Sequence, residues 1–107
     1  MQNGVNFSLS RGVLSAQLFG EIDHHSARIY REGIDSELYV VRPSTLVLDF
    51  SDIGFMDSSG IALIIGRHEI CLSLGVAMRL VGLSDAQKKI VRLSGIERLK
   101  NVSIESK

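Results

Sequence analysis

The sequence lacks several features that stabilise or target small proteins. Its 107 residues contain one cysteine, Cys71, which excludes an internal disulfide and suits a reducing compartment. No apolar run reaches the length of a membrane span, and the chain does not open with the basic and apolar segments of a signal peptide. We therefore expect a cytoplasmic protein without membrane contact, in which Cys71 is a small buried side chain on a helix.

An excess of charge of either sign is also lacking. Lys and Arg total 12, as do Asp and Glu, so the formal charge is zero. Direct binding of nucleic acid depends on a basic surface, and none is expected here. The apolar fraction of 45% and charged fraction of 22% are ordinary globular values. Since no linker, repeat or low-complexity tract interrupts the chain, we expect a single domain over residues 1–107.

The first half of the chain alternates strand and helix signals. Apolar and polar residues alternate over 5–9 and 13–18 about a turn at Gly12, which predicts a hairpin. Apolar residues then recur at helical spacing over 27–38, and Pro43 limits that helix downstream. Asp23 and Ser26 are both candidate N-caps for it.

The second half continues the alternation. The apolar run over 46–50 predicts a strand covered on both faces, followed by a loop over 51–57. A helix is expected from near Ser58 to near Gly75, and a strand over 76–81. Ser84 and Gln87 form a capping-box pattern for a further helix ending near Gly95. A last short strand is expected over 102–104, so the chain predicts an α/β fold with helices packed on a sheet.

The helix from 58 to 75 has an unusually wide apolar arc. On a helical wheel Ile61, Ile64, Ile65, Cys71 and Leu72 share one face, while Leu63, Ile70 and Leu74 point away from it. A neighbouring helix or a partner protein could cover the rest of the arc, and we favour the helix. His68 falls on the core face, where we expect a partly buried, hydrogen-bonded side chain.

Nothing in the sequence predicts an enzyme site, a metal site or a cofactor. Ser58 is not in a G-x-S-x-G elbow, because Met56 replaces the first glycine. The adjacent His24 and His25 lack further ligands at metal-binding spacing. Neither glycine-rich phosphate-binding motif occurs. On general grounds, Asp57 or Ser58 is a helix N-cap.

Four blocks of sequence resemble the anti-sigma factor antagonists of the STAS family. They are GEIDHHSA at 20–27, FMDSSG at 55–60, Gly66-Arg67 and LSGI at 93–96. The similarity covers almost the whole chain and is strongest to the antagonists of the sporulation sigma factor F. It implies the STAS fold, a mixed, largely parallel sheet of four to five strands. Family members commonly carry a further helix after the last strand, and none is expected over 104–107.

The resemblance implies a phosphorylation switch. Ser58 is the residue expected to be phosphorylated, by an anti-sigma factor that is itself a serine kinase. Only the unphosphorylated form is expected to bind that kinase and release the sigma factor, and a PP2C-type phosphatase resets it. Ser59 is expected to make local hydrogen bonds, and Gly60 to let the partner approach closely. The residues implied in partner binding are Glu21, Asp23, His24, Asp57, Ser58, Ser59, Gly60 and Arg67.

Two other functions remain open at this stage. One is a STAS domain of another stress-signalling pathway, acting as a scaffold or a nucleotide-sensing module. The other is a small serine hydrolase that uses Ser58. The antagonist function is favoured because FMDSSG argues against a constitutive scaffold, and because no base is placed beside Ser58 by any spacing rule.

Overall fold

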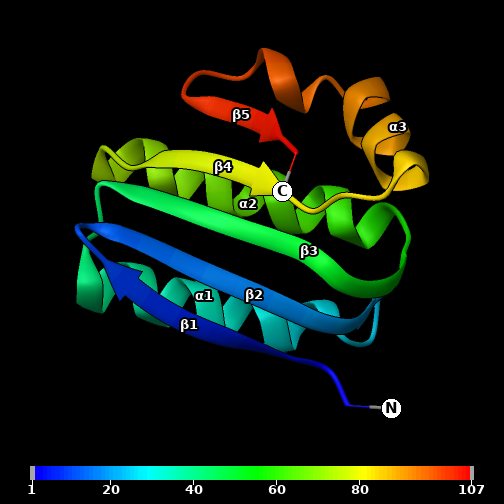
Figure 1. The fold of residues 1–107 in the computed structure, drawn as a ribbon, viewed down its shortest axis with the longest axis horizontal. Helices are drawn as coiled ribbons and strands as arrows, with labels where there is room; N and C mark the ends of the chain where they lie inside the picture. Colours follow the sequence, from blue (N-terminus) through cyan, green and yellow to red (C-terminus); the bar gives the residue numbers. More distant parts are fainter. Residues whose placement is uncertain (1, 107) are drawn as a thin grey trace.

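The computed structural model describes residues 2–106 and has strands and helices in the predicted alternation (Figure 1). The hairpin, the three helices and the last strand all form where the sequence predicts them. In chain order the elements are β1 (Gly4–Ser10), β2 (Val13–Ile22), α1 (Ala27–Val41), β3 (Thr45–Met56), α2 (Ser58–Leu74), β4 (Ala77–Val81), α3 (Asp85–Leu93), a 3-10 helix (Ile96–Arg98) and β5 (Val102–Glu105).

The strands lie in one sheet in sequence order, β1-β2-β3-β4-β5. The β1–β2 pair is antiparallel and the other three pairs are parallel, so the predicted mixed, largely parallel sheet is confirmed. Every β–α–β step moves in the same direction across the sheet. Right-handed crossovers then place the helices on the same face, and Figure 1 shows α1 and α2 behind the strands.

The hydrophobic core lies between that face and the helices. Strands β2, β3 and β4 direct alternate side chains toward α1 and α2, as expected for a period of two residues. The fully buried side chains include Leu14, Leu18, Leu46, Leu48, Met78 and Leu80 from the sheet, Tyr30, Ile34 and Leu38 from α1, and Ile64 and Cys71 from α2. The expectation that Cys71 is buried is confirmed.

The prediction that the 46–50 strand is covered on both faces is wrong. Leu46 and Leu48 are buried beneath the helices, whereas Thr45 and Asp49 are half-buried on the opposite, open face. Val47 shares the open face and is nevertheless 8% exposed. The prediction failed because only one residue of the apolar run, Val47, lies on the open face. Val47 is buried by its neighbours in the sheet and not by a helix.

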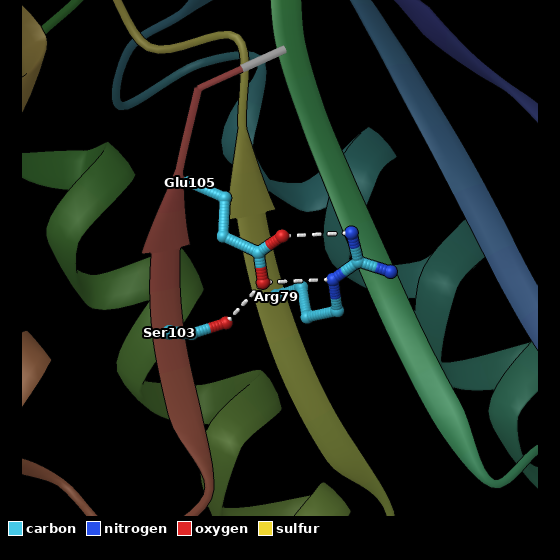
Figure 2. Close-up of polar contacts among 3 residues, drawn as sticks. All are labelled: Arg79, Ser103 and Glu105. Carbon is cyan, nitrogen blue, oxygen red and sulfur yellow. Dashed lines mark hydrogen bonds and ion pairs between the residues drawn. The ribbon is translucent and has the colours of Figure 1, made fainter.

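A polar network occupies the open face where β4 meets β5. In Figure 2 the side chains of Arg79, Ser103 and Glu105 lie in front of the strands, with α2 behind. Arg79 donates from Nε and Nη2 to the two carboxylate oxygens of Glu105, at 2.9 and 2.8 Å. Ser103 donates to the same carboxylate at 2.6 Å. These bonds tie the short last strand to its neighbour.

This network is expected to make stability depend on pH in acid. The hydrogen bond from Arg79, followed by that from Ser103, lowers the pKa of Glu105 from 4.5 to about 2. A lowered carboxyl pKa stabilises the fold above the unfolded value and loses that contribution as pH falls from about 4.5 to 2. Glu105→Gln should flatten the dependence of Tm on pH in this window. An unchanged acid profile for Glu105→Gln would contradict the assignment.

Strand β3 is longer than predicted, because residues 51–56 continue it instead of forming a loop. They pair with the end of β2 as far as Met56 opposite Ile22, with register shifts near Gly20. Gly20 has a φ of +104°, and a Cβ there would overlap the backbone of Asn3 and Gln2. The positive φ and the close approach of residues 2–3 therefore require glycine at this position.

The buried face of α2 differs from the predicted one. Ile65 and Leu72 are 37% and 43% exposed, while Leu63 is 3% exposed. Helix α1 packs beside α2 and covers the Leu63 side, which confirms the expectation that a neighbouring helix covers part of the apolar arc. His68 is buried with its Nε2 2.8 Å from the carbonyl oxygen of Lys100, which confirms the prediction for that residue.

The signals for the ends of helices hold well. Ser84 and Gln87 form a complete capping box at α3, with bonds of 3.1 and 3.0 Å. Gly75 and Gly95 take positive φ at the ends predicted for α2 and α3. Within residues 2–106, the helices are too short or too polar to span a membrane. Met1 and Lys107, the ends of the expected domain, lie outside the described residues.

Candidate functional site

Two loops of the predicted site meet at one edge of the sheet. Strands β2 and β3 are parallel, so their carboxyl ends lie together, with Glu21 opposite Phe55. The backbone N–H of Asp57 donates to the carbonyl oxygen of Ile22 at 3.2 Å. The GEIDHH and FMDSSG segments, more than 30 positions apart in the sequence, therefore adjoin in the fold.

Ser58 is the first residue of α2 and is exposed. Its hydroxyl makes no hydrogen bond to any other residue within 2–106. Asp57 is the N-cap, as the sequence predicts, and its carboxylate accepts from the backbone N–H of Ser59 at 2.7 Å. The first turn of a helix has unpaired N–H groups and a partial positive charge, so it tolerates an anion. The position is therefore accessible and electrostatically suited to a modified serine.

Asp23 organises the turn between β2 and α1. Its carboxylate accepts from the backbone N–H groups of His25 and Ser26, both at 2.9 Å. The bond from Ser26 is the main reason why the pKa of Asp23 is lowered. Ser26 takes the N-cap position of α1, but its hydroxyl donates to the carbonyl of Glu21 at 2.7 Å and makes no capping bond. Asp23 and Ser26 thus hold the loop, and neither side chain caps the helix as predicted.

Two substitutions at Asp23 should distinguish the role of its hydrogen bonds in the turn from the role of its charge in partner binding. Asp23→Asn keeps a side-chain oxygen that can accept both backbone N–H groups, so Tm should stay within a few degrees of the wild type. Asp23→Ala removes the acceptor and should lower Tm. If the charge contacts a partner, both variants should bind that partner less well. Full binding by Asp23→Asn together with a lower Tm for Asp23→Ala would limit the residue to a structural role.

Glu21 and His24 flank this turn. The carbonyl oxygen of Glu21 accepts from Tyr30 Oη at 2.9 Å, and burial raises the pKa of that hydroxyl to about 12. His24 is exposed and lies edge-on to His25, with ring centroids 5.7 Å apart. Within the described part of the chain, no three His, Cys, Asp or Glu residues are grouped to hold a metal ion.

The predicted role of Gly60 does not fit its position. Gly60 is buried, and a Cβ there would overlap Cγ and Sδ of Met56. The glycine therefore leaves room for a core side chain at the end of β3. The cause is the turn at Asp57, which folds the start of α2 back over the strand that precedes it.

Arg67 is also buried, at 6% exposure. Its Nε lies 2.6 Å from Oδ1 of Asp35 on α1, an ion pair whose geometry falls short of a hydrogen bond. Burial lowers the pKa of Arg67 and raises that of Asp35, in both cases more than the ion pair opposes. Arg67 thus joins α2 to α1, and its part in partner binding stays a prediction.

A groove between α1 and α2 opens beside Ser58. It has a volume of about 470 Å³ and is lined by His24, Ala27, Arg28, Arg31, Ser59, Ala62, Leu63, Gly66 and Arg67. The sequence reasoning missed Arg28, Arg31 and Asp35. Their spacing of three and four residues places them on one side of α1, which is the signal that could have identified them. Ser59 borders the groove, and only its backbone makes the predicted local hydrogen bond.

Comparison with protein families supports the sequence resemblance. The STAS domain matches residues 6–105, from within β1 to the end of β5. The chain belongs to the STAS domain family. The STAS match includes the whole of the edge formed by the two loops and α2.

Several relatives of this STAS domain are named as antagonists. The anti-sigma F factor antagonist of Paenibacillus polymyxa is 30% identical over 89 residues, which are 83% of this chain and 76% of that protein. The anti-sigma F factor antagonist of Lysinibacillus sphaericus is 28% identical over 88 residues, 82% of this chain and 75% of the relative. The anti-sigma-B factor antagonist of Bacillus subtilis is 23% identical over 99% of this chain and 95% of its own length.

Solved structures share the fold. The anti-sigma factor antagonist SpoIIAA in its unphosphorylated form matches with a TM-score of 0.80, at 25% identity over 97% of this chain and 88% of its own. The Bacillus cell fate determinant SpoIIAA in the phosphorylated form matches with a TM-score of 0.74, at 25% identity over 97% and 91% of the two chains. This STAS domain therefore has the same overall fold as SpoIIAA, which has been solved in unphosphorylated and phosphorylated forms.

Proposed function

We propose that this STAS domain is an anti-sigma factor antagonist controlled by phosphorylation of Ser58. In the unphosphorylated form it binds an anti-sigma factor serine kinase and releases the sigma factor which that kinase holds. The kinase then transfers phosphate to Ser58, and a PP2C-type phosphatase removes it. The domain acts by binding and has no catalytic activity of its own.

The relatives support the general part of this proposal. Those from Paenibacillus polymyxa and Lysinibacillus sphaericus are named anti-sigma F factor antagonists, and SpoIIAA is described as an anti-sigma factor antagonist. SpoIIAA has also been solved in a phosphorylated form. The FMDSSG block lies within the region matched by the STAS family.

The exposure of Ser58 at the start of α2 is the observation that supports phosphorylation at this residue. A kinase and a phosphatase must both reach the hydroxyl, and Ser58 is exposed with no competing hydrogen bond within residues 2–106. Its neighbour Ser59 lines a groove, and Gly60 is buried. The exposure of Ser58 supports the proposal that it, and not Ser59, is the modified serine.

Charge gives the switch its mechanism. Phosphorylation adds about −1.5 to −2 charge at neutral pH. At a helix N-terminus this charge is tolerated, so the modified domain should remain folded. The added charge would stand next to Asp57 and on the same edge of the sheet as Asp23. A partner surface complementary to the neutral hydroxyl would then meet like-charge repulsion and a desolvation cost, and each 1.4 kcal/mol lowers affinity tenfold.

The proposal is tested by release of a sigma factor. The unphosphorylated chain is added to a complex of the Paenibacillus polymyxa anti-sigma F factor with its sigma factor, and free sigma factor is measured by size-exclusion chromatography. The Paenibacillus antagonist serves as the positive control. We expect both proteins to release sigma factor. Release by the Paenibacillus protein alone would contradict the proposed antagonist function for this partner.

A further inference from the structure

Three arginines line the groove between α1 and α2, and the ion pairs of the described residues involve only two of them. Arg67 is paired with Asp35, and Arg28, which lines the groove as well, is paired with Glu32 at 2.7 Å. Arg31, which also lines the groove, is exposed and makes no hydrogen bond or ion pair within residues 2–106. One guanidinium group therefore remains available to a ligand entering the groove.

The groove is hollow because its α2 wall is made of small residues. Ala62 and Gly66 line it, and a Cβ added to Gly66 would meet no atom within 4 Å. A glycine inside a helix costs about 0.5–1 kcal/mol relative to alanine. Packing inside this chain does not require that glycine, unlike Gly60, which accommodates Met56. The position keeps space open on the surface at some cost in stability.

The groove adjoins the proposed phosphorylation site. Ser59 lines it and is bonded in sequence to Ser58, the first residue of the same helix. Beyond Ser58, the outer side of α2 exposes Ile65, and Phe55 just before the helix is 50% exposed. A protein that covers Ser58 therefore meets apolar side chains on one side and the arginine-lined groove on the other.

We infer that this groove receives an acidic side chain of the anti-sigma factor, held by the guanidinium of Arg31. The inference rests on the proposed function and adds the chemistry of the partner to it. Guanidinium and carboxylate groups form charge-assisted, often bidentate hydrogen bonds. The small α2 wall at Ala62 and Gly66 lets such a side chain reach the guanidinium. The partner therefore carries Asp or Glu next to the segment that covers Ser58.

The test measures affinity for the Paenibacillus polymyxa anti-sigma F factor by calorimetry at several salt concentrations. Arg31→Glu should weaken binding at least tenfold and reduce its dependence on salt, while Arg31→Lys should retain part of the affinity. Lys89→Glu makes the same change of charge on exposed α3, remote from the groove, and should bind like the wild type. Circular dichroism should show that all variants are folded.

Gly66→Leu provides a second, independent variant. It should raise Tm, since leucine favours the helix and its Cβ meets open space, and it should still weaken binding by filling the groove. A loss of affinity together with a gain in stability cannot come from unfolding. Gly66→Ala fills less of the groove and should weaken binding less than Gly66→Leu does.

The outcomes separate this inference from the proposed function. If the wild type binds the anti-sigma factor and Arg31→Glu and Gly66→Leu bind equally well, the groove inference is wrong and the antagonist function stands. If the wild type fails to bind while the Paenibacillus antagonist binds, both are wrong. The wild type is also tested with ATP or GTP in the absence of the anti-sigma factor. Nucleotide binding that is lost in Arg31→Glu would assign the groove to a nucleotide and contradict the inference of an acidic side chain.

Discussion

Arg67→Met is expected to lower the free energy of unfolding by about 2–3 kcal/mol. Removing one member of a buried ion pair typically costs about 3–5 kcal/mol, because the remaining charge stays buried without compensation. The lower range applies here because the Asp35 side chain, left behind on α1, is 26% exposed and regains some hydration. Methionine keeps most of the volume, so the loss reports mainly on charge. Urea denaturation at neutral pH measures it.

A double-mutant cycle tests this explanation. Adding Asp35→Ala to Arg67→Met removes the uncompensated carboxylate and should restore stability to within about 1 kcal/mol of the wild type. The Arg28–Glu32 pair is the matched control, since its contact of 2.7 Å is close to the 2.6 Å of the Arg67–Asp35 contact, but its side chains are 74% and 60% exposed. Arg28→Met should therefore leave unfolding nearly unchanged. Equal losses for Arg28→Met and Arg67→Met would contradict the role of burial.

Ser58→Asp is expected to weaken binding to the anti-sigma factor at least tenfold. The substitution places a carboxylate beside Asp57, on the edge shared with Asp23, and this added charge must lose its hydration when the partner covers it. The loss should be smaller than that caused by phosphate, which carries more charge. Ser58→Ala should keep wild-type affinity and give an antagonist that cannot be inactivated. Calorimetric titration of the unphosphorylated proteins measures both.

Ser8→Asp adds the same charge on strand β1 and serves as the control, because Ser8 is exposed on the edge of the sheet opposite β5. It should bind as the wild type does. Circular dichroism checks that the Ser58 variants stay folded, as expected for an acidic group at a helix N-terminus. If Ser58→Asp binds the anti-sigma factor with wild-type affinity, added charge at this serine does not control binding.

Local signals in the sequence predicted most of the fold. Alternation about Gly12 located the hairpin, and the Ser84–Gln87 capping box located α3. These features depend on residues close together in the chain, which is why sequence alone identifies them. The order of the strands in the sheet was not predicted, because it depends on pairing between segments that are distant in the chain.

Features that depend on tertiary contacts were not predictable in the same way. The buried side of α2 is set by its contact with α1, so a helical wheel placed the exposed Ile65 on the core face. The glycine at 60 faces Met56, a contact created only when α2 folds back over β3. A loop was expected over 51–57, but residues 51–56 form a strand because β2 supplies a partner for them.

The residues of the candidate site were predicted mainly from the family resemblance, and the fold shows how they are arranged. General physics identified Asp57 or Ser58 only as a helix cap, and Asp57 is that cap. The convergence of the Asp23 turn with Ser58 required the parallel pairing of β2 and β3. Arg31 was overlooked because its spacing from Arg28 and Asp35 indicates a shared side of α1 but does not indicate a groove. Its significance appears only where α1 lies beside Gly66.

Locating phosphate by mass spectrometry tests the proposed switch most directly. The chain is incubated with the Paenibacillus polymyxa anti-sigma F factor and ATP, with the Paenibacillus antagonist in parallel, and the modified residue is identified by peptide fragmentation. We predict one phosphate, on Ser58, which is absent from Ser58→Ala and present in Ser59→Ala. Phosphate on Ser59, with Ser58→Ala still fully modified, would contradict the account. So would an unmodified chain beside a fully phosphorylated Paenibacillus antagonist.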